Sequence, residues 1–321
     1  MRPSRFGAAL CGVLIVGSAC GTPPPQPNGT APGGWTLEVT TPDISVDAPQ
    51  RFEIVLNQTV GTANTPVVYG SVRVAFAYLG RDGTSVPDPR GEATARYLAV
   101  PGTRAEGSGP VRSDPADARG AYIADDVRFD AVGVWKASAT ADIQGKAGAL
   151  HVATTFPVAA SPAFPAVGDP AIPVDNPTMK SHVPAGQIDS RAVDGSPIPD
   201  PELHRWSVRD ALAAHLPILL LFSTPAYCKS QICGPETEQM TELAKTYADR
   251  AVFIHVEVWR NFDTAALSPS ATAWLLHGGV LNEPWLYLID ANGTILDRWS
   301  PLLFDWTQVA AEVAALPSLK R

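Results

Sequence analysis

Cys228 and Cys233 are the residues of this 321-residue chain whose type and spacing most clearly permit chemistry. They follow the apolar run 218–222 and adjoin a helical pattern over residues 235–247. A thiolate near a helix N-terminus is stabilised by backbone N–H groups and the helix dipole, and Lys229 adds positive charge. The pattern therefore predicts a reactive pair in which Cys228 attacks and Cys233 resolves.

The spacing of the two cysteines limits where they can lie. On a regular helix, residues five positions apart have Cα atoms roughly 8.5 to 9 Å apart. A disulfide requires about 4.4 to 6.8 Å between Cα atoms. Cys228 is therefore expected in the loop before the helix, where it is more exposed than Cys233, and oxidation is expected to change the local structure.

His255 and Glu257 are the second pair of candidate residues. They lie on one face of the strand predicted over residues 252–259, where an interior position requires polar groups to be paired. One hypothesis is a proton relay to the thiols, because a buried acid or base near a disulfide assists exchange. The alternative is a structural ion pair or hydrogen-bonded pair.

Further motifs carry a family resemblance. Tyr227 directly precedes Cys228, the sequence Glu283-Pro284-Trp285 follows later, and Asn292-Gly293 indicates a final hairpin. Residues 201–321 resemble the thioredoxin superfamily, including its TlpA-like members. The resemblance implies a thioredoxin-like α/β fold, a cis-proline at Pro284 facing the cysteines, and thiol-disulfide oxidoreductase activity without cofactor or metal. One departure is the four residues between the cysteines, where thioredoxins have two.

Three alternative functions remain open. The cysteine spacing and Thr224-Pro225 also resemble two-cysteine peroxiredoxins, although Thr224 lies four positions before Cys228 rather than three. Two thiolates and a later histidine, His255 or His277, would suit copper handling as in SCO-type proteins. A non-enzymatic adaptor with a structural disulfide is the third.

The N-terminus has the pattern of an export signal. Basic residues precede the apolar run 6–16, which is shorter than the about 20 residues that span a bilayer. Cys20 follows small residues and resembles the lipobox cysteine of bacterial lipoproteins. The resemblance implies a signal peptide over 1–19, a lipid anchor at Cys20 and an extracytoplasmic, membrane-attached protein. Residues 20–34, rich in Pro and Gly, are predicted to be a tether.

Two further regions precede the cysteines. Residues 35–160 alternate apolar and polar positions between turn-rich intervals, which predicts an immunoglobulin-like β-sandwich that resembles YtkA-like modules. Residues 161–200 are rich in proline and are predicted to be a linker. The expected fold class is thus multidomain, with an all-β sandwich followed by an α/β thioredoxin-like fold.

Composition narrows the class of partner. With 45% hydrophobic and 17% charged residues, the chain has enough apolar material for packed cores. Its net charge is -8 and becomes about -10 once Arg2 and Arg5 are removed with the signal peptide. Nucleic acid is therefore not an expected partner. The expected partners are thiols or disulfides of exported proteins, and the membrane through Cys20.

Overall fold

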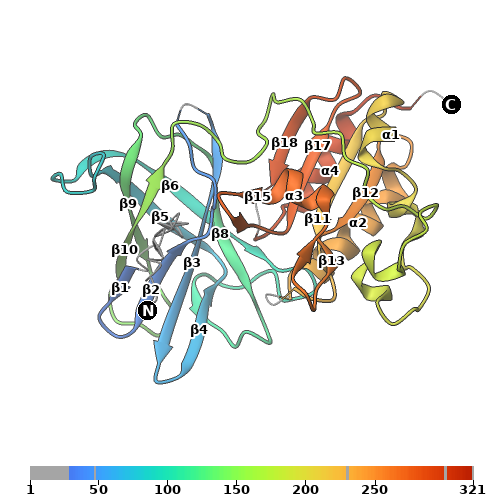
Figure 1. The fold of residues 1–321 in the computed structure, drawn as a ribbon. Helices are drawn as coiled ribbons and strands as arrows, with labels where there is room; N and C mark the ends of the chain where they lie inside the picture. Colours follow the sequence, from blue (N-terminus) through green and yellow to red (C-terminus); the bar gives the residue numbers. More distant parts are fainter. Residues whose placement is uncertain (1–28, 47, 229–230, 300–301, 320–321) are drawn as a thin grey trace, which may run out of the picture.

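The structure is a computed structural model that describes residues 29–46, 48–228, 231–299 and 302–319. Two sheets dominate it, a large one formed by the N-terminal half and a small one formed by the C-terminal third (Figure 1). About 38% of the chain is strand and 17% is helix. Among the described residues, no helix combines the length and apolar character that crossing a bilayer requires.

The large sheet has ten strands and is antiparallel throughout. Its main path runs in the order β1-β2-β3-β8-β6-β5-β9-β10, with β4 paired to β3 and to β7. The strands are β1 (Gly29–Ala31), β2 (Trp35–Val39), β3 (Gln50–Val60), β4 (Ala63–Val68), β5 (Ser71–Tyr78), β6 (Asp88–Ala99), β7 (Val111–Arg112), β8 (Gly120–Val127), β9 (Gly133–Ala141) and β10 (Leu150–Val158).

This sheet curls until it is nearly closed. Its first and last strands approach each other, and the Gly29 amide donates a hydrogen bond to Thr154 Oγ1 at 3.2 Å. Alternate side chains of β5, β9 and β10 point inward, so that along β10 every second residue is buried. Aromatic rings fill the interior, and Phe52 contacts the rings of Phe76 and Phe156 at centroid distances of 5.0 and 5.1 Å.

The small sheet has four strands in the order β12-β11-β17-β18. Its central strand β11 runs parallel to β12 and antiparallel to β17, and β18 completes the edge. All six residues of β11 are buried, as expected for a strand covered on both faces. The strands are β11 (Ile218–Ser223), β12 (Val252–Glu257), β17 (Trp285–Ile289) and β18 (Ile295–Trp299).

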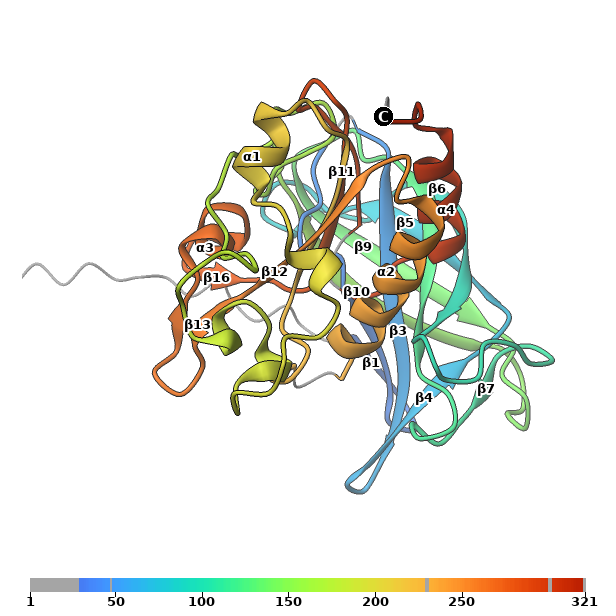
Figure 2. The ribbon, with the colours of Figure 1, turned by 90° about the vertical axis from the view of Figure 1, so that its right-hand side faces the viewer.

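Four α-helices among the described residues cover the small sheet. Helices α1 (Val208–Ala213) and α3 (Pro269–Leu275) pack on one face, and α2 (Cys233–Tyr247) and α4 (Trp306–Ala315) on the other (Figure 2). Shorter elements complete the region, namely β13 (Trp259–Asn261), β14 (Ala266–Leu267), β15 (Leu276–His277), β16 (Val280–Leu281) and the 3-10 helices η1 (Ala185–Gln187), η2 (Ser190–Ala192) and η3 (Pro201–His204).

The predicted fold class is wrong. In place of an immunoglobulin-like sandwich followed by a thioredoxin-like α/β fold, the chain is mostly β, with one large barrel-like sheet and only four α-helices in its described part. An alternating sequence pattern predicts only that a strand has one interior face. Such strands can form either two packed sheets or one curled sheet, so the pattern does not distinguish the two folds. Helix α3 ends at Leu275, and His277 belongs to the ribbon β15/β16.

The proline-rich segment 161–200 packs against the small sheet. Its Gly168 and Ala171 amides donate hydrogen bonds to the Ile295 and Gly293 carbonyls, at 2.9 and 2.8 Å. Phe164 is buried in the apolar core on the α1/α3 face. The segment thus has ordered contacts along the edge of the sheet, and it carries polar residues into the interior beside β12.

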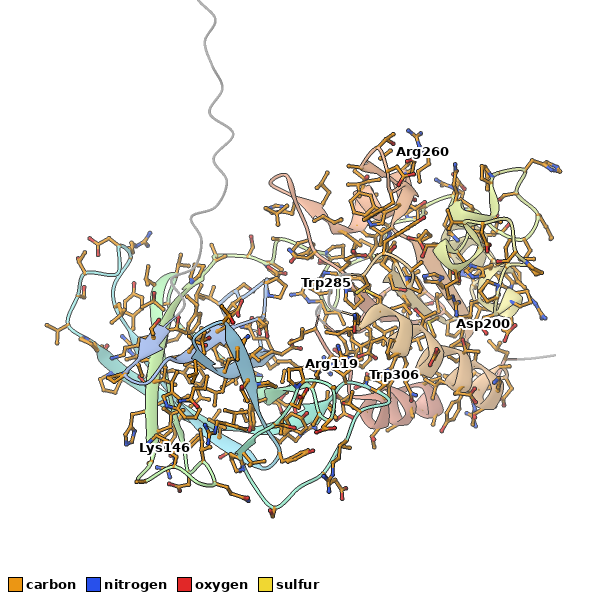
Figure 3. The ribbon with its side chains drawn as sticks, turned by 90° about the horizontal axis from the view of Figure 1, so that it is seen from below. Arg119, Lys146, Asp200, Arg260, Trp285 and Trp306 are labelled. Carbon is orange, nitrogen blue, oxygen red and sulfur yellow. The ribbon has the colours of Figure 1, made fainter. Side chains whose placement is uncertain are left out.

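Ion pairs and apolar contacts join the large sheet to the C-terminal region. Arg298 on β18 pairs with the buried Asp43 at 2.8 Å, and Arg51 on β3 pairs with Asp297 at 2.7 Å. Figure 3 shows Arg119, Trp285 and Trp306 near this boundary, whereas Lys146 lies far from it, at the outer end of the large sheet.

Candidate functional site

Cys228 and Cys233 meet at the start of α2. Cys228 lies in the turn after β11, half-buried, and Cys233 is the first residue of the helix, fully buried. They are separate thiols, and the Cys233 backbone N–H donates to Cys228 Sγ at 3.4 Å. This confirms the prediction that Cys228 precedes the helix. Its sulfur uses an N–H group that has no partner within the helix, the arrangement that stabilises a thiolate.

The two thiols have different surroundings. The hydrogen bond to Cys228 and burial raise the pKa of Cys233 well above its ordinary value. Glu283 is a carboxyl close enough for its charge to act on both cysteines. Burial, reinforced by the charges of Cys228 and Glu257, raises the pKa of Glu283 to about 8. The site thus holds one accessible sulfur, one protected sulfur and a carboxyl that takes up or releases a proton near neutral pH.

Tyr227 separates the cysteines from a groove on the surface. Its ring stacks on that of Phe262, with centroids 4.2 Å apart and planes 4° apart. Trp259 packs edge-on against Phe262. These aromatic side chains line a depression of about 360 Å³, whose opposite wall includes Gly186 and Val193 of the proline-rich segment. A groove with aromatic rings along one wall can hold a peptide segment next to Cys228.

The large sheet supports the loop between the cysteines. Ile232, which immediately precedes Cys233, is buried in an apolar cluster with Ala121 and Ile123 of β8 and with Leu303. Arg119 Nη1, beside β8, donates a hydrogen bond to Gln231 Oε1 at 3.4 Å. The N-terminal sheet therefore holds the cysteine loop in place directly.

His255 and Glu257 lie buried on β12, as their pattern predicts. Glu257 accepts hydrogen bonds from the amides of Ser190, Val258 and Trp259. Burial raises the pKa of Glu257, against the opposing effect of the His255 charge. Glu257 is therefore held by backbone amides, and it is linked to the turn before Cys228 through Ser190, whose Oγ accepts from the Ala226 amide at 3.1 Å.

His255 connects to the cysteine helix through two hydroxyl groups. Its Nε2 lies 2.9 Å from Ser223 Oγ, which lies 2.9 Å from Thr237 Oγ1. Thr237 Oγ1 in turn donates to the Cys233 carbonyl at 2.7 Å. The histidine thus reaches the backbone of Cys233, and the chain of hydrogen bonds ends there.

The other predicted site residues are placed as follows. The Glu283–Pro284 peptide bond is cis, as the sequence predicts, and Pro284 is buried directly before β17. The His277 ring lies 6.1 Å from that of Phe164, on the ribbon β15/β16. Lys229 and Cys20 lie outside the described residues, so their predicted roles stay predictions.

Several residues of this region carried no signal in the sequence. Asp189 and His204 face His255 in the interior, with Asp189 Oδ2 at 3.4 Å from His204 Nε2. Burial lowers the pKa of His204. Asp189 comes from the proline-rich segment, which has no periodic pattern, and His204 comes from the short 3-10 helix η3 directly after it. Glu283 was identified only as the neighbour of Pro284. No motif spacing connects any of them to the cysteines.

Comparison with known proteins identifies no relative of this chain. No protein-family model, curated protein or solved structure matches this chain. Its function must be inferred from its own residues and their geometry.

Proposed function

We propose that the protein carries out thiol-disulfide exchange through Cys228 and Cys233. The observation that carries the proposal is the contact between Cys228 Sγ and the backbone N–H of Cys233, at 3.4 Å, at the first turn of α2. A helix N-terminus favours negative charge by about 0.3 to 1 kcal/mol when exposed, and up to about 2 kcal/mol when partly buried. This corresponds to at most about 1.5 pKa units for the sulfur that it faces.

The unequal burial of the cysteines assigns their roles. Cys228 is half-buried beside the aromatic groove, whereas Cys233 has no exposed surface. A foreign disulfide can therefore approach only the first of them. The raised pKa of Cys233 keeps its proton until Cys228 has reacted.

Each step of the exchange balances. The Cys228 thiolate attacks one sulfur of a partner disulfide, forms a mixed disulfide and expels the second partner sulfur as a thiolate, which takes up a proton. Cys233 then gives up its proton and attacks Cys228 Sγ, which releases the first partner sulfur. The partner gains two electrons and two protons, and the protein is left with a Cys228–Cys233 disulfide that an external dithiol must reduce. The reverse sequence oxidises a partner dithiol.

Glu283 supports the second half of this cycle. The proton that leaves Cys233 must reach an acceptor in a region closed to solvent, and the Glu283 carboxyl, with a pKa of about 8, ionises in the range where thiols do. Glu257 adds negative charge nearby. Of the two residues suggested by sequence as a proton relay, His255 and Glu257, only Glu257 keeps a part in this proposal, because the His255 chain of hydrogen bonds ends at a backbone carbonyl.

The expected partners are exported proteins that carry thiols or disulfides. The groove beside Tyr227, lined by Trp259 and Phe262, offers a docking surface for the partner chain next to Cys228. An export signal over residues 1–19 and a lipid anchor at Cys20 would place the protein outside the cytoplasm on the membrane, where disulfides persist. The net charge of -8 argues against nucleic acid as a partner.

Trapping tests the proposal. The full chain with Cys233→Ser is incubated with glutathione disulfide and with a disulfide-bonded peptide, and adducts are measured by mass spectrometry without reductant. Stable adducts on Cys228 are expected, because no resolving thiol remains. Cys228→Ser is the matched control and should form none on Cys233, and peptide mapping counts adducts on Cys11 and Cys20 separately. Equal labelling of both variants, or of neither, would contradict the proposed roles.

A redox titration separates exchange from a structural role. Exchange catalysts have potentials of roughly -270 to -120 mV, whereas structural disulfides lie below about -300 mV. We expect the Cys228/Cys233 pair in the first range. A value below about -300 mV would identify a structural disulfide and an adaptor function. Peroxide consumption in the same samples would instead favour a thiol peroxidase.

A further inference from the structure

Asp189, His204 and His255 form a compact buried cluster apart from the cysteines. Each has at most 1% of its surface exposed. They come from three segments, because Asp189 precedes η2, His204 ends η3 and His255 lies on β12. Asp189 Oδ2 lies 3.4 Å from His204 Nε2 and 3.6 Å from His255 Nδ1, and the three atoms lie within 4.8 Å of one another.

These distances are long for hydrogen bonds but suit a shared ion. An N–H···O bond spans about 2.7 to 3.2 Å. Within the described part of the chain, neither ring nitrogen of His204 has a hydrogen-bond partner, nor does His255 Nδ1. Two ligand atoms, each about 2.1 Å from a tetrahedral ion, are about 3.4 Å apart. The two distances from Asp189 Oδ2, 3.4 and 3.6 Å, are therefore close to those of ligands around a common centre.

The direction of the neighbouring hydrogen bonds fixes the His255 tautomer. The Thr237 hydroxyl proton is used on the Cys233 carbonyl, which can only accept. Ser223 must then donate to Thr237, so Ser223 Oγ accepts from His255 Nε2. Nε2 also faces the Ser223 carbonyl at 3.2 Å, which requires a proton on Nε2 as well. With Nε2 engaged as a donor, Nδ1 is the ring nitrogen of His255 that faces the Asp189 carboxylate, at 3.6 Å.

A metal ion between His255 Nδ1 and Asp189 Oδ2 would give both buried atoms a partner. A metal ligand of this type is normally held as His255 is, with its other nitrogen donating to a carbonyl or hydroxyl group. Arg191 already contacts Asp189, with Nη2 2.7 Å from Oδ2, but its charge is shared with Asp200 at 2.9 Å. The carboxylates of Asp189 and Asp200 and the Arg191 guanidinium together carry one negative charge, so the site attracts a divalent cation.

We propose that Asp189 Oδ2, His204 Nε2 and His255 Nδ1 bind one divalent transition-metal ion. Two imidazoles and a carboxylate suit zinc, and a fourth tetrahedral position would be left for solvent. The ion would fasten the proline-rich segment, through Asp189, and the helix η3, through His204, to strand β12 of the small sheet. It would thereby hold the wall of the groove beside Tyr227 and the Ser190 contact with the turn before Cys228.

Metal content of the full chain tests this site directly. The protein is stripped with a chelator, loaded with Zn²⁺ or Co²⁺, freed of excess ion and measured by plasma mass spectrometry. One ion per chain is expected, with visible Co²⁺ absorption typical of tetrahedral nitrogen and oxygen ligands and without a thiolate band. Substoichiometric binding, or a thiolate band, would overturn the assignment. This measurement on the unaltered protein needs no variant to fold.

Variants then assign the ligands. Asp189→Asn and His204→Gln should each lower Zn²⁺ affinity by at least tenfold, the size of effect expected from the loss of a ligand. Cys228→Ser/Cys233→Ser and His277→Gln are matched controls that should bind as the parent does. Zn²⁺ should also raise the melting temperature of the parent but not of His204→Gln. Equal affinity across all variants would refute the site, whatever the outcome of the thiol experiments.

Discussion

Replacing Glu236 by Gln should remove a large part of the pH dependence of stability. Glu236 lies in the first turn of α2, the helix that begins with Cys233, and has no exposed surface. Its carboxyl accepts hydrogen bonds from the Phe304 amide and from the Trp306 indole N–H. Burial raises the pKa of Glu236 to about 8, and the nearby Glu53 contributes in the same direction.

The size and sign of the effect follow from this pKa. The unfolded chain loses the proton near the ordinary value of 4.5, whereas the folded protein keeps it up to about pH 8. Between these values the folded state binds more protons, so stability is greatest below about pH 4.5 and falls as the pH rises through about 8. At about 1.36 kcal/mol per pKa unit, the loss is at most about 5 kcal/mol, and we expect about 2 to 5 kcal/mol.

Urea unfolding at pH 5 and pH 9 measures the effect. Glu236→Gln should be slightly less stable than the parent at pH 5, by about 1 kcal/mol, because one hydrogen bond is altered. At pH 9 it should be more stable, because it buries no charge. Glu238→Gln is the matched control on the exposed side of the same helix and should follow the parent. Parallel pH profiles for the parent and Glu236→Gln would refute the reasoning.

Two further changes probe how the large sheet supports the site. Ile232→Ala leaves a cavity in the apolar cluster beside Cys233, so it should lower the free energy of unfolding by about 2 to 4 kcal/mol and speed alkylation of Cys233. The control Val86→Ala, at an exposed position, should change neither quantity. Asp43→Asn leaves the Arg298 guanidinium without its counter-charge, so it should lower the free energy of unfolding in urea by about 3 kcal/mol. The control Asp142→Asn, at an exposed position, should change it little. Unchanged alkylation in the first case, or equal stability of the two Asp variants in the second, would show that these contacts do not couple the sheets.

The local features of the cysteine site could be predicted from sequence. The run 218–222 is β-strand, the helical pattern at 235–247 is the body of α2, and Cys228 lies in the turn between them. These features depend on hydrophobic periodicity and on helix geometry, which act over a few residues. The same reasoning placed His255 and Glu257 on one buried face of a strand, without identifying the groups they contact.

The fold class could not be predicted in the same way. Strands of the N-terminal half were recognised by alternation, yet their closure into one curled sheet depends on pairing between β6 and β8 and between β5 and β9, far apart in the chain. A resemblance based on a few motifs near the cysteines also gave too much weight to helix. Strand outweighs helix, at about 38% against 17%, and helices α1 and α3 are only six and seven residues long.

The sequence by itself determined which residues have reactive chemistry and which local elements carry them, because both follow from side-chain type and short-range periodicity. Only the tertiary structure brought Asp189 and His204 to His255, Glu283 to the cysteines, and Ile232 to the large sheet. Such contacts are decided by how whole sheets and segments pack, which depends on burying apolar surface over the entire chain. No spacing between two residues in the sequence records that outcome.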